Sequence, residues 1–285
     1  MSNKILNEKE RVIMPEVPVK EKEGKIIREL KDKRKENVKY FETENHGGIA
    51  AVYPYPVHYE EDGQWKEIDN SLQEDNAEEE GYGNKSSRLK VKFAKHGDSK
   101  KLVTLKQGNH KLSWGLEEAS SGSGKKEKAE EKEEKKVIFR VYEKMADEQM
   151  DEKEWNHPQM KIPDARSGGI YEEILPGVDL EYLLEGETLK ENVILKDEEA
   201  AKTNFCLRIR HKGLRLKADE QGALCFFAER EKEENAEAVF HLAVPCMYDQ
   251  SGIYSDGVSY EMKDCGKGET LLTIITDTEW LTDSQ

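Results

Sequence analysis

The sequence contains seven histidines, the side chains most often used for acid–base catalysis and metal binding near neutral pH. They are His46, His58, His96, His110, His157, His211 and His241. None forms an HExxH or HxH arrangement, and none stands beside a serine or cysteine in a nucleophile motif. His58 and His241 fall within predicted strands, where a structural histidine is the simpler interpretation. We therefore predict no catalytic histidine.

Four cysteines stand in the last third of the chain, 19, 21 and 19 residues apart: Cys206, Cys225, Cys246 and Cys265. They form no CxxC pair, and no histidine lies at zinc-finger spacing from them, so the spacing predicts no metal site. Four cysteines in 285 residues are also too few for a disulfide scaffold. We expect small side chains on or between strands, with the disulfide state left open. We also expect no cofactor.

Carboxylates are so abundant that no single pair is a strong signal. Asp179 and Glu181 share one face of a predicted strand, as the two acids of a glycosidase would. The polar face of a half-buried strand has the same spacing, and this is the simpler interpretation. The acidic runs at 69–81 and 248–257 lack the spacing of a calcium loop. We therefore expect no enzyme active site.

The chain is strongly acidic: 45 Lys and Arg against 60 Asp and Glu give a net charge of −15. Such a surplus repels phosphate backbones, so we predict no nucleic-acid partner. Apolar runs are too short for a signal peptide (about 7–15 residues) or a membrane helix (about 20), so we expect no membrane insertion. Exposed aromatic rings could stack on sugars. The candidate glycan-facing rings are Trp65, Trp114, Tyr53, Tyr55 and Tyr59.

Short alternating segments separated by turn residues dominate the sequence, which is typical of all-β proteins. The segment 57–68 contains two strands around an Asp-Gly turn, and 102–114 contains two around a Gly-Asn turn. No helical period recurs between strands, so a βα-type enzyme fold is not expected. The pattern predicts an all-β, antiparallel, sandwich-like fold with two β lobes, a charged low-complexity insert between them and a charged N-terminal arm.

The expected parts follow from shifts in composition along the chain. In order, they are an arm at 1–38, a first β lobe at 39–117, a charged insert at 118–168 with one strand at 137–142, and a second β lobe at 169–283. The arm is expected to be helical or disordered, with Ile26, Ile27 and Leu30 as its only apolar stripe. The insert begins with Gly and Ser and continues as a run of Lys and Glu.

Six segments follow one another along the chain: YPYPVHYEEDGQWKEIDNSL, LKVKFAKH, KLVTLKQGNHKLSWGL, LPGVDLEYLLEGETLKENVILK, VPCMYDQSGIYSDGVSYEM and LLTIITDTEWL. Together they resemble the N-terminal region of Gram-positive RHS/YD-repeat proteins, which are wall-associated and polymorphic-toxin-like. The resemblance covers about residues 35–283. Its most specific block contains the structural motif Pro176, Gly177, Val178, Asp179, Leu180, Tyr182, Gly186, Leu189, Lys190 and Glu191.

The resemblance implies a non-enzymatic structural module of a secreted or cell-surface protein, which packages or presents downstream modules. Its implied partners are repeat or effector modules of the same or a neighbouring polypeptide. A carbohydrate- or cell-wall-binding β-sandwich is the alternative function, with cell-wall polysaccharide as partner. The resemblance brings no catalytic residue. The chain as written carries no signal peptide, which keeps a cytoplasmic fragment as the alternative location.

Overall fold

The computed structural model describes residues 24–77, 79–117, 136–143, 165–202, 205–230 and 236–283. The first part of the predicted arm, most of the predicted insert and His157 lie outside these residues. The described chain is almost entirely antiparallel β-structure, which confirms the predicted all-β, sandwich-like fold.

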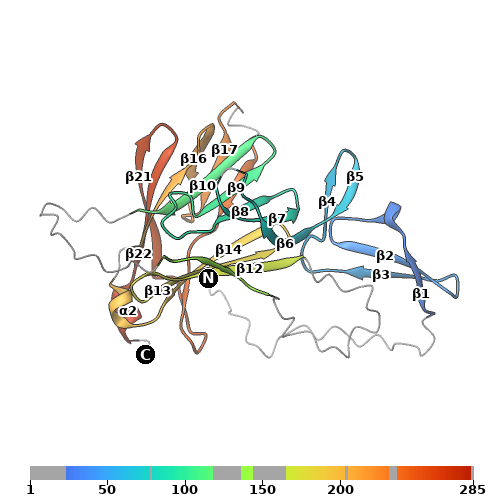
Figure 1. The fold of residues 1–285 in the computed structure, drawn as a ribbon, viewed down its shortest axis with the longest axis horizontal. Helices are drawn as coiled ribbons and strands as arrows, with labels where there is room; N and C mark the ends of the chain where they lie inside the picture. Colours follow the sequence, from blue (N-terminus) through green and yellow to red (C-terminus); the bar gives the residue numbers. More distant parts are fainter. Residues whose placement is uncertain are drawn as a thin grey trace, which may run out of the picture.

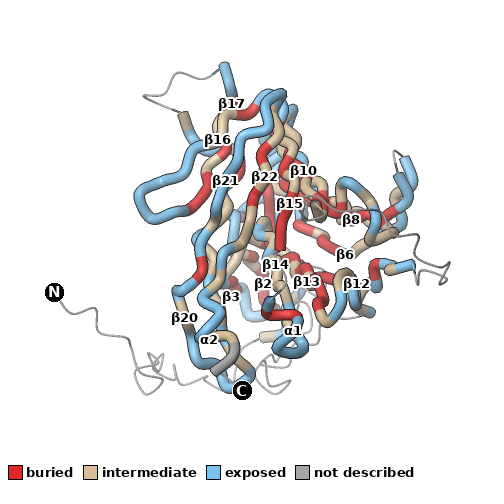
Figure 2. The backbone as a smooth tube through the Cα atoms, turned by 90° about the vertical axis from the view of Figure 1, so that its left-hand side faces the viewer, coloured by how far each residue is buried: buried red, intermediate tan, exposed pale blue. Residues whose placement is uncertain are grey.

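One layer is an eight-stranded sheet with the order β21-β22-β15-β10-β9-β8-β7-β6 (Figure 1). Its strands are β6 (Asp69–Glu74), β7 (Gly81–Ser86), β8 (Lys90–Ala94), β9 (Val103–Gln107), β10 (His110–Leu116), β15 (Phe205–Arg210), β21 (Val258–Gly266) and β22 (Glu269–Thr276). Because β10 pairs with β15, strands from the sequence ranges 39–117 and 169–283 meet in this sheet. Buried residues gather along β10, β15 and β22 (Figure 2).

Two smaller sheets complete the main core. They are β11 (Phe139–Val141), β12 (Arg166–Leu175), β13 (Val178–Glu185) and β14 (Thr188–Leu195), and then β16 (Leu214–Ala218), β17 (Leu224–Ala228) and β18 (Ala238–Leu242). Aromatic rings join the layers: Phe93 of β8 stacks on Phe139 of β11 with centroids 4.7 Å apart, and lies 5.2 Å from Tyr182 of β13. Large rings of this kind supply much of the buried apolar area of a sandwich core.

A second, smaller core lies at one end of the molecule (Figure 1). Its residues come from β1 (Ile26–Glu29), β2 (Val38–Thr43), β3 (Gly48–Val52) and the segment 53–57. The hairpin of β4 (His58–Glu61) and β5 (Gln64–Glu67) follows this segment, and the 3₁₀ turn η2 (Lys31–Lys33) lies between β1 and β2. The structure places a strand at Ile26–Glu29, where the sequence predicts a helical or disordered arm. Pairing with β2 satisfies the backbone of this segment, whereas its short apolar stripe could bury little as a helix.

The remaining elements are small: β19 (Met247–Tyr248), β20 (Tyr254–Ser255), α1 (Glu198–Ala201) and α2 (Thr278–Asp283). Within the described part of the chain, no helix has the length and apolar character needed to cross a membrane.

A lysine-lined groove as the candidate nucleic-acid interface

The outer face of β8, β9 and β10 carries a row of lysines. Lys90 pairs with Lys106, and Lys106 pairs with Lys111, so these side chains leave the same face of three neighbouring strands. The alternation of the strands explains this placement. Val91 follows Lys90 and Leu105 precedes Lys106, and both are buried on the opposite face.

A shallow groove of about 280 Å³ lies over this face. Five lysines line it, namely Lys90, Lys92, Lys101, Lys106 and Lys111. Two acids, Asp75 and Glu79, also line it, so the five positive and two negative charges give the lining a local charge of +3. The whole chain, by contrast, carries −15. The groove is therefore a positive site on an acidic protein.

Asp75, one of the two acids in the groove, is held as an anion by its surroundings. The backbone N–H of Ala77 donates to Asp75 Oδ1 at 3.0 Å and lowers the pKa of Asp75, and Lys92 acts in the same direction. Lys92 Nζ lies 3.3 Å from the same oxygen. Asp75 thus offsets one lysine, and the surplus of positive charge in the groove remains.

Screening decides whether this local charge or the net charge acts on a ligand. At physiological ionic strength, exposed charges more than about 8 Å apart are largely screened. A phosphate in the groove therefore interacts mainly with the lysines around it. Lysine ammonium groups bind phosphates as compact point charges, without reading a base. Among the described residues that line the groove, none is a histidine or a cysteine.

The glycan-facing candidates lie in two separate places. Tyr53 and Tyr59 are only 5% and 6% exposed, so neither offers an open ring face to a sugar. Tyr53 belongs to the small N-terminal core with Tyr55 packed on it, whereas Trp114 packs on the main core. Trp65, on β5, is partly buried. The structure thus does not bring these rings together into one surface.

The segment that contains the structural motif, residues 176–191, forms the β13–β14 hairpin and the turn before it. Gly177 and Gly186 adopt positive φ values of 70° and 56° in the two turns. Asp179 Oδ1 accepts from the backbone N–H of Glu173 at 2.7 Å and pairs with Lys196, and Glu181 accepts from Tyr142 Oη at 2.6 Å. Both carboxylates therefore serve structural contacts. The other motif residues lie on the same hairpin or its leading turn: Pro176, Val178, Leu180, Tyr182, Leu189, Lys190 and Glu191.

The sequence did contain a signal for the groove. Lysines alternate with apolar residues in LKVKFA and TLKQGNHKL, which indicates that one face of each strand is positive. The net charge of the chain does not reveal this positive face, because a total charge does not show where lysines cluster.

Three curated relatives share about a quarter of their aligned residues with this chain. They are tRNA(Glu)-specific nuclease WapA of Bacillus subtilis subsp. natto (strain BEST195), tRNA nuclease WapA of Bacillus subtilis (strain 168) and tRNA3(Ser)-specific nuclease WapA of Bacillus spizizenii, each 25% identical over 273 residues. Each match covers 93% of this chain and 10% of the relative, so the chain spans about 10% of their length. No protein-family model matches the chain, and no solved structure matches it.

These relatives correct the functional predictions. Their names describe tRNA nucleases, so the predicted resemblance to RHS/YD-repeat surface proteins is wrong in the function it implies, while its wall-associated, polymorphic-toxin-like context agrees with the WapA names. The names also overturn the non-enzymatic structural module, its carbohydrate- or wall-binding alternative and the exclusion of an enzyme. The exclusion of nucleic acid is wrong for the same reason, since tRNA is what the relatives are named for. The chain is similar, over nearly its whole length, to a segment of tRNA nucleases from Bacillus.

Proposed function

We propose that this chain works within a tRNA-cleaving nuclease and that its lysine-lined groove contacts the phosphate backbone of the tRNA. The observation that carries the proposal is the local charge of +3 in a groove on a chain with a net charge of −15. The names of the relatives supply the kind of nucleic acid and the reaction of the whole protein. A secreted or surface location stays a prediction.

The groove would act through charge and counterion release. Each ammonium group placed against a phosphate displaces a condensed counterion, which makes binding strongly dependent on salt concentration. Lys90, Lys106 and Lys111 follow one another across three strands, so they can meet successive phosphates of one backbone. Such contacts position a nucleic acid without selecting its sequence.

The relatives' names agree with a contact that does not select sequence. One is named for tRNA(Glu) and another for tRNA3(Ser), yet each matches this chain at the same identity over the same length. A phosphate-binding groove would serve either tRNA. On this proposal, the groove holds and orients the substrate and neutralises its charge near the point of contact.

The experiment is a binding titration with the full chain and fluorescently labelled tRNA(Glu) and tRNA(Ser) transcripts, at several salt concentrations between 50 and 200 mM. The groove variant is the triple substitution Lys90→Gln, Lys106→Gln and Lys111→Gln. The control changes three exposed lysines elsewhere: Lys212→Gln, Lys263→Gln and Lys267→Gln. Both variants change the net charge by the same amount, so a difference between them reports on position.

We expect the wild-type chain to bind both tRNAs about equally and the groove variant to bind at least tenfold more weakly. The slope of log affinity against log salt should fall by about 2–3, close to one for each lysine removed. The control variant should keep most of the affinity. No binding by the wild-type chain, or equal losses in the two variants, would overturn the groove as the interface. Separation of the incubated tRNA on a denaturing gel tells whether this chain also cleaves.

A further inference from the structure

The sheet formed by β16, β17 and β18 carries a second group of polar side chains, independent of the groove. Cys225 of β17 pairs directly with His241 of β18, so both side chains leave the same face of the sheet. Leu224 and Phe226, which flank Cys225 on β17, are each 1% exposed and face the core. Alternation therefore directs the Cys225 thiol and the His241 imidazole away from the core.

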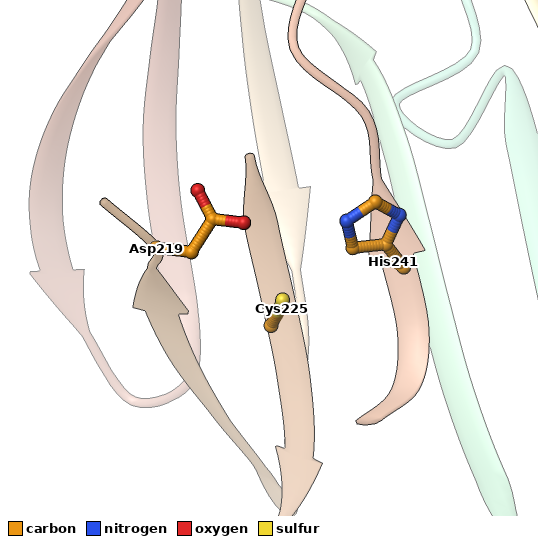
Figure 3. Close-up of side chains that lie close together, drawn as sticks. All are labelled: Asp219, Cys225 and His241. Carbon is orange, nitrogen blue, oxygen red and sulfur yellow. The ribbon is translucent and has the colours of Figure 1, made fainter. Parts of the chain in front are cut away.

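The turn after β16 adds a carboxylate to this pair. Asp219 lies between β16 and β17, and its Oδ1 accepts hydrogen bonds from the backbone N–H groups of Gln221 and Ala223, both at 2.9 Å. These bonds fix the carboxylate in the turn. One donor atom each from Asp219, Cys225 and His241 lies within 4.8 Å of the other two. Figure 3 shows the Asp219 carboxylate and a ring nitrogen of His241 facing each other across Cys225.

One oxygen, one sulfur and one nitrogen donor form a ligand set that suits zinc. A tetrahedral Zn²⁺ ion with bonds of about 2.0–2.3 Å holds its ligand atoms about 3.3–3.8 Å apart. Small side-chain rotations would bring the three atoms from their present spacing to that geometry. A thiolate ligand disfavours calcium and magnesium, which prefer oxygen. We propose that Asp219, Cys225 and His241 bind one Zn²⁺ ion.

Three protein ligands leave the fourth zinc position to solvent, which is the arrangement of open rather than closed zinc sites. The placement agrees, because Asp219 and His241 are exposed and Cys225 is partly buried. Lys217, the partner of Cys225 on β16, adds a positive charge on the same face that opposes a cation. The Asp219 carboxylate and a deprotonated Cys225 supply two negative charges, which outweigh it.

The spacing of these residues explains why the sequence did not indicate the site. Known zinc motifs place two ligands within a few positions of each other, whereas Cys225 and His241 are 16 residues apart and become neighbours only through strand pairing. The prediction of no metal site rests on the cysteines and on the histidines near them in sequence, and so it leaves out Asp219. The third ligand comes from a turn.

The test measures zinc binding to the untagged full chain, by competition with a chromogenic zinc chelator. The wild-type chain should bind one equivalent, and with Co²⁺ it should show a near-ultraviolet band from thiolate-to-metal charge transfer. Cys225→Ser and His241→Ala should each weaken zinc binding more than tenfold, and Cys225→Ser should abolish the cobalt band. The matched controls are Cys246→Ser and Cys265→Ser, which remove exposed thiols outside the group and should change nothing.

Two further variants separate binding from folding. Asp219→Asn keeps an oxygen that can accept the two turn hydrogen bonds but removes the charge, so it should weaken zinc binding while leaving the unfolding midpoint of the metal-free chain unchanged. Lys217→Gln removes the opposing charge and should tighten binding. The proposal is overturned if the wild-type chain binds no zinc at equimolar concentration. It is also overturned if Cys246→Ser or Cys265→Ser loses as much affinity as Cys225→Ser.

Discussion

Two regions of the molecule bury glutamates in different ways. In the N-terminal core, Glu29 accepts two hydrogen bonds from Arg34, at 2.6 and 2.8 Å, and Glu67 pairs with both Arg34 and Lys39. Burial alone would raise the pKa of Glu29 and of Glu67, but the hydrogen bonds and charges of Arg34 and Lys39 lower both overall. Cations thus compensate the largely buried Glu29 and the half-exposed Glu67 in this region.

In the main core, Glu191 of β14 has no such compensation. Its Oε2 accepts from Trp114 Nε1 at 2.8 Å, and no ion pair of Glu191 is found in the described chain. Burial raises the pKa of Glu191, and the nearby Tyr182 hydroxyl and the hydrogen bond from Trp114 offset this only in part. Both regions desolvate the same kind of side chain, so the partner decides the direction of the pKa shift.

The largest effect should come from removing the cation at the centre of the N-terminal network. Arg34→Met leaves Glu29 buried without its partner, and breaking a buried pair in this way costs about 3–5 kcal/mol. We expect the free energy of unfolding of the N-terminal core, measured by hydrogen exchange of the β1–β5 amides, to fall by that amount. The double variant Glu29→Met with Arg34→Met is the control, and it should recover most of the loss. A single variant within about 1 kcal/mol of wild type would show that solvent, not Arg34, stabilises Glu29.

The second prediction concerns the uncompensated glutamate. Glu191→Gln keeps an acceptor for Trp114 and removes the buried charge, so it should stabilise the main core by about 1–2 kcal/mol at pH 8. The sign follows from the raised pKa of Glu191. Wild-type stability from this group is complete below the unfolded pKa of about 4.3 and is lost as the pH rises through the folded value. The gain should therefore shrink at pH 5, and urea titrations at both pH values measure it. A gain that is equal at the two pH values would point to packing instead of charge.

The third prediction is that acid acts on the N-terminal core in the opposite direction. Burial lowers the pKa of His58, and Arg34 and Lys39 add to this, while the pKa of Glu29 is lowered by Arg34. Stability from His58 is present above the unfolded pKa of about 6.5 and declines below it, and that from Glu29 declines below about 4.3. We expect a loss of about 1 kcal/mol between pH 7 and pH 5, arising from His58. Hydrogen exchange at both pH values should show faster opening of β1–β5 at pH 5. His58→Gln should remove most of the difference, and a dependence that survives this variant would contradict the assignment to His58.

The same contrast explains which features could be predicted from the sequence. Alternation and turn residues are local, so the all-β fold, the Asp62-Gly63 hairpin turn and the β13–β14 hairpin were predictable. The pairing of β10 with β15 joins residues almost a hundred positions apart, and no local pattern encodes it. The Trp114–Glu191 contact joins residues 77 positions apart and depends on such a distant pairing. The Arg34–Glu67 pair spans 33 positions, which is also beyond the reach of a local pattern. The alternating lysines can be recognised within each single strand. That they form one row follows only from the pairing of β8, β9 and β10.

The smallest effect should come from the exposed pair beside the network. Arg28 Nε donates to Glu42 Oε2 at 2.7 Å, and this hydrogen bond raises the pKa of Arg28, yet the Arg28 side chain is 68% exposed. Water and salt screen such a pair, so its loss leaves no buried charge behind. Arg28→Gln should therefore leave the urea midpoint unchanged within error, while Arg34→Met, six positions along, shifts it strongly. If the two variants shifted the midpoint equally, burial would not be what distinguishes these arginines.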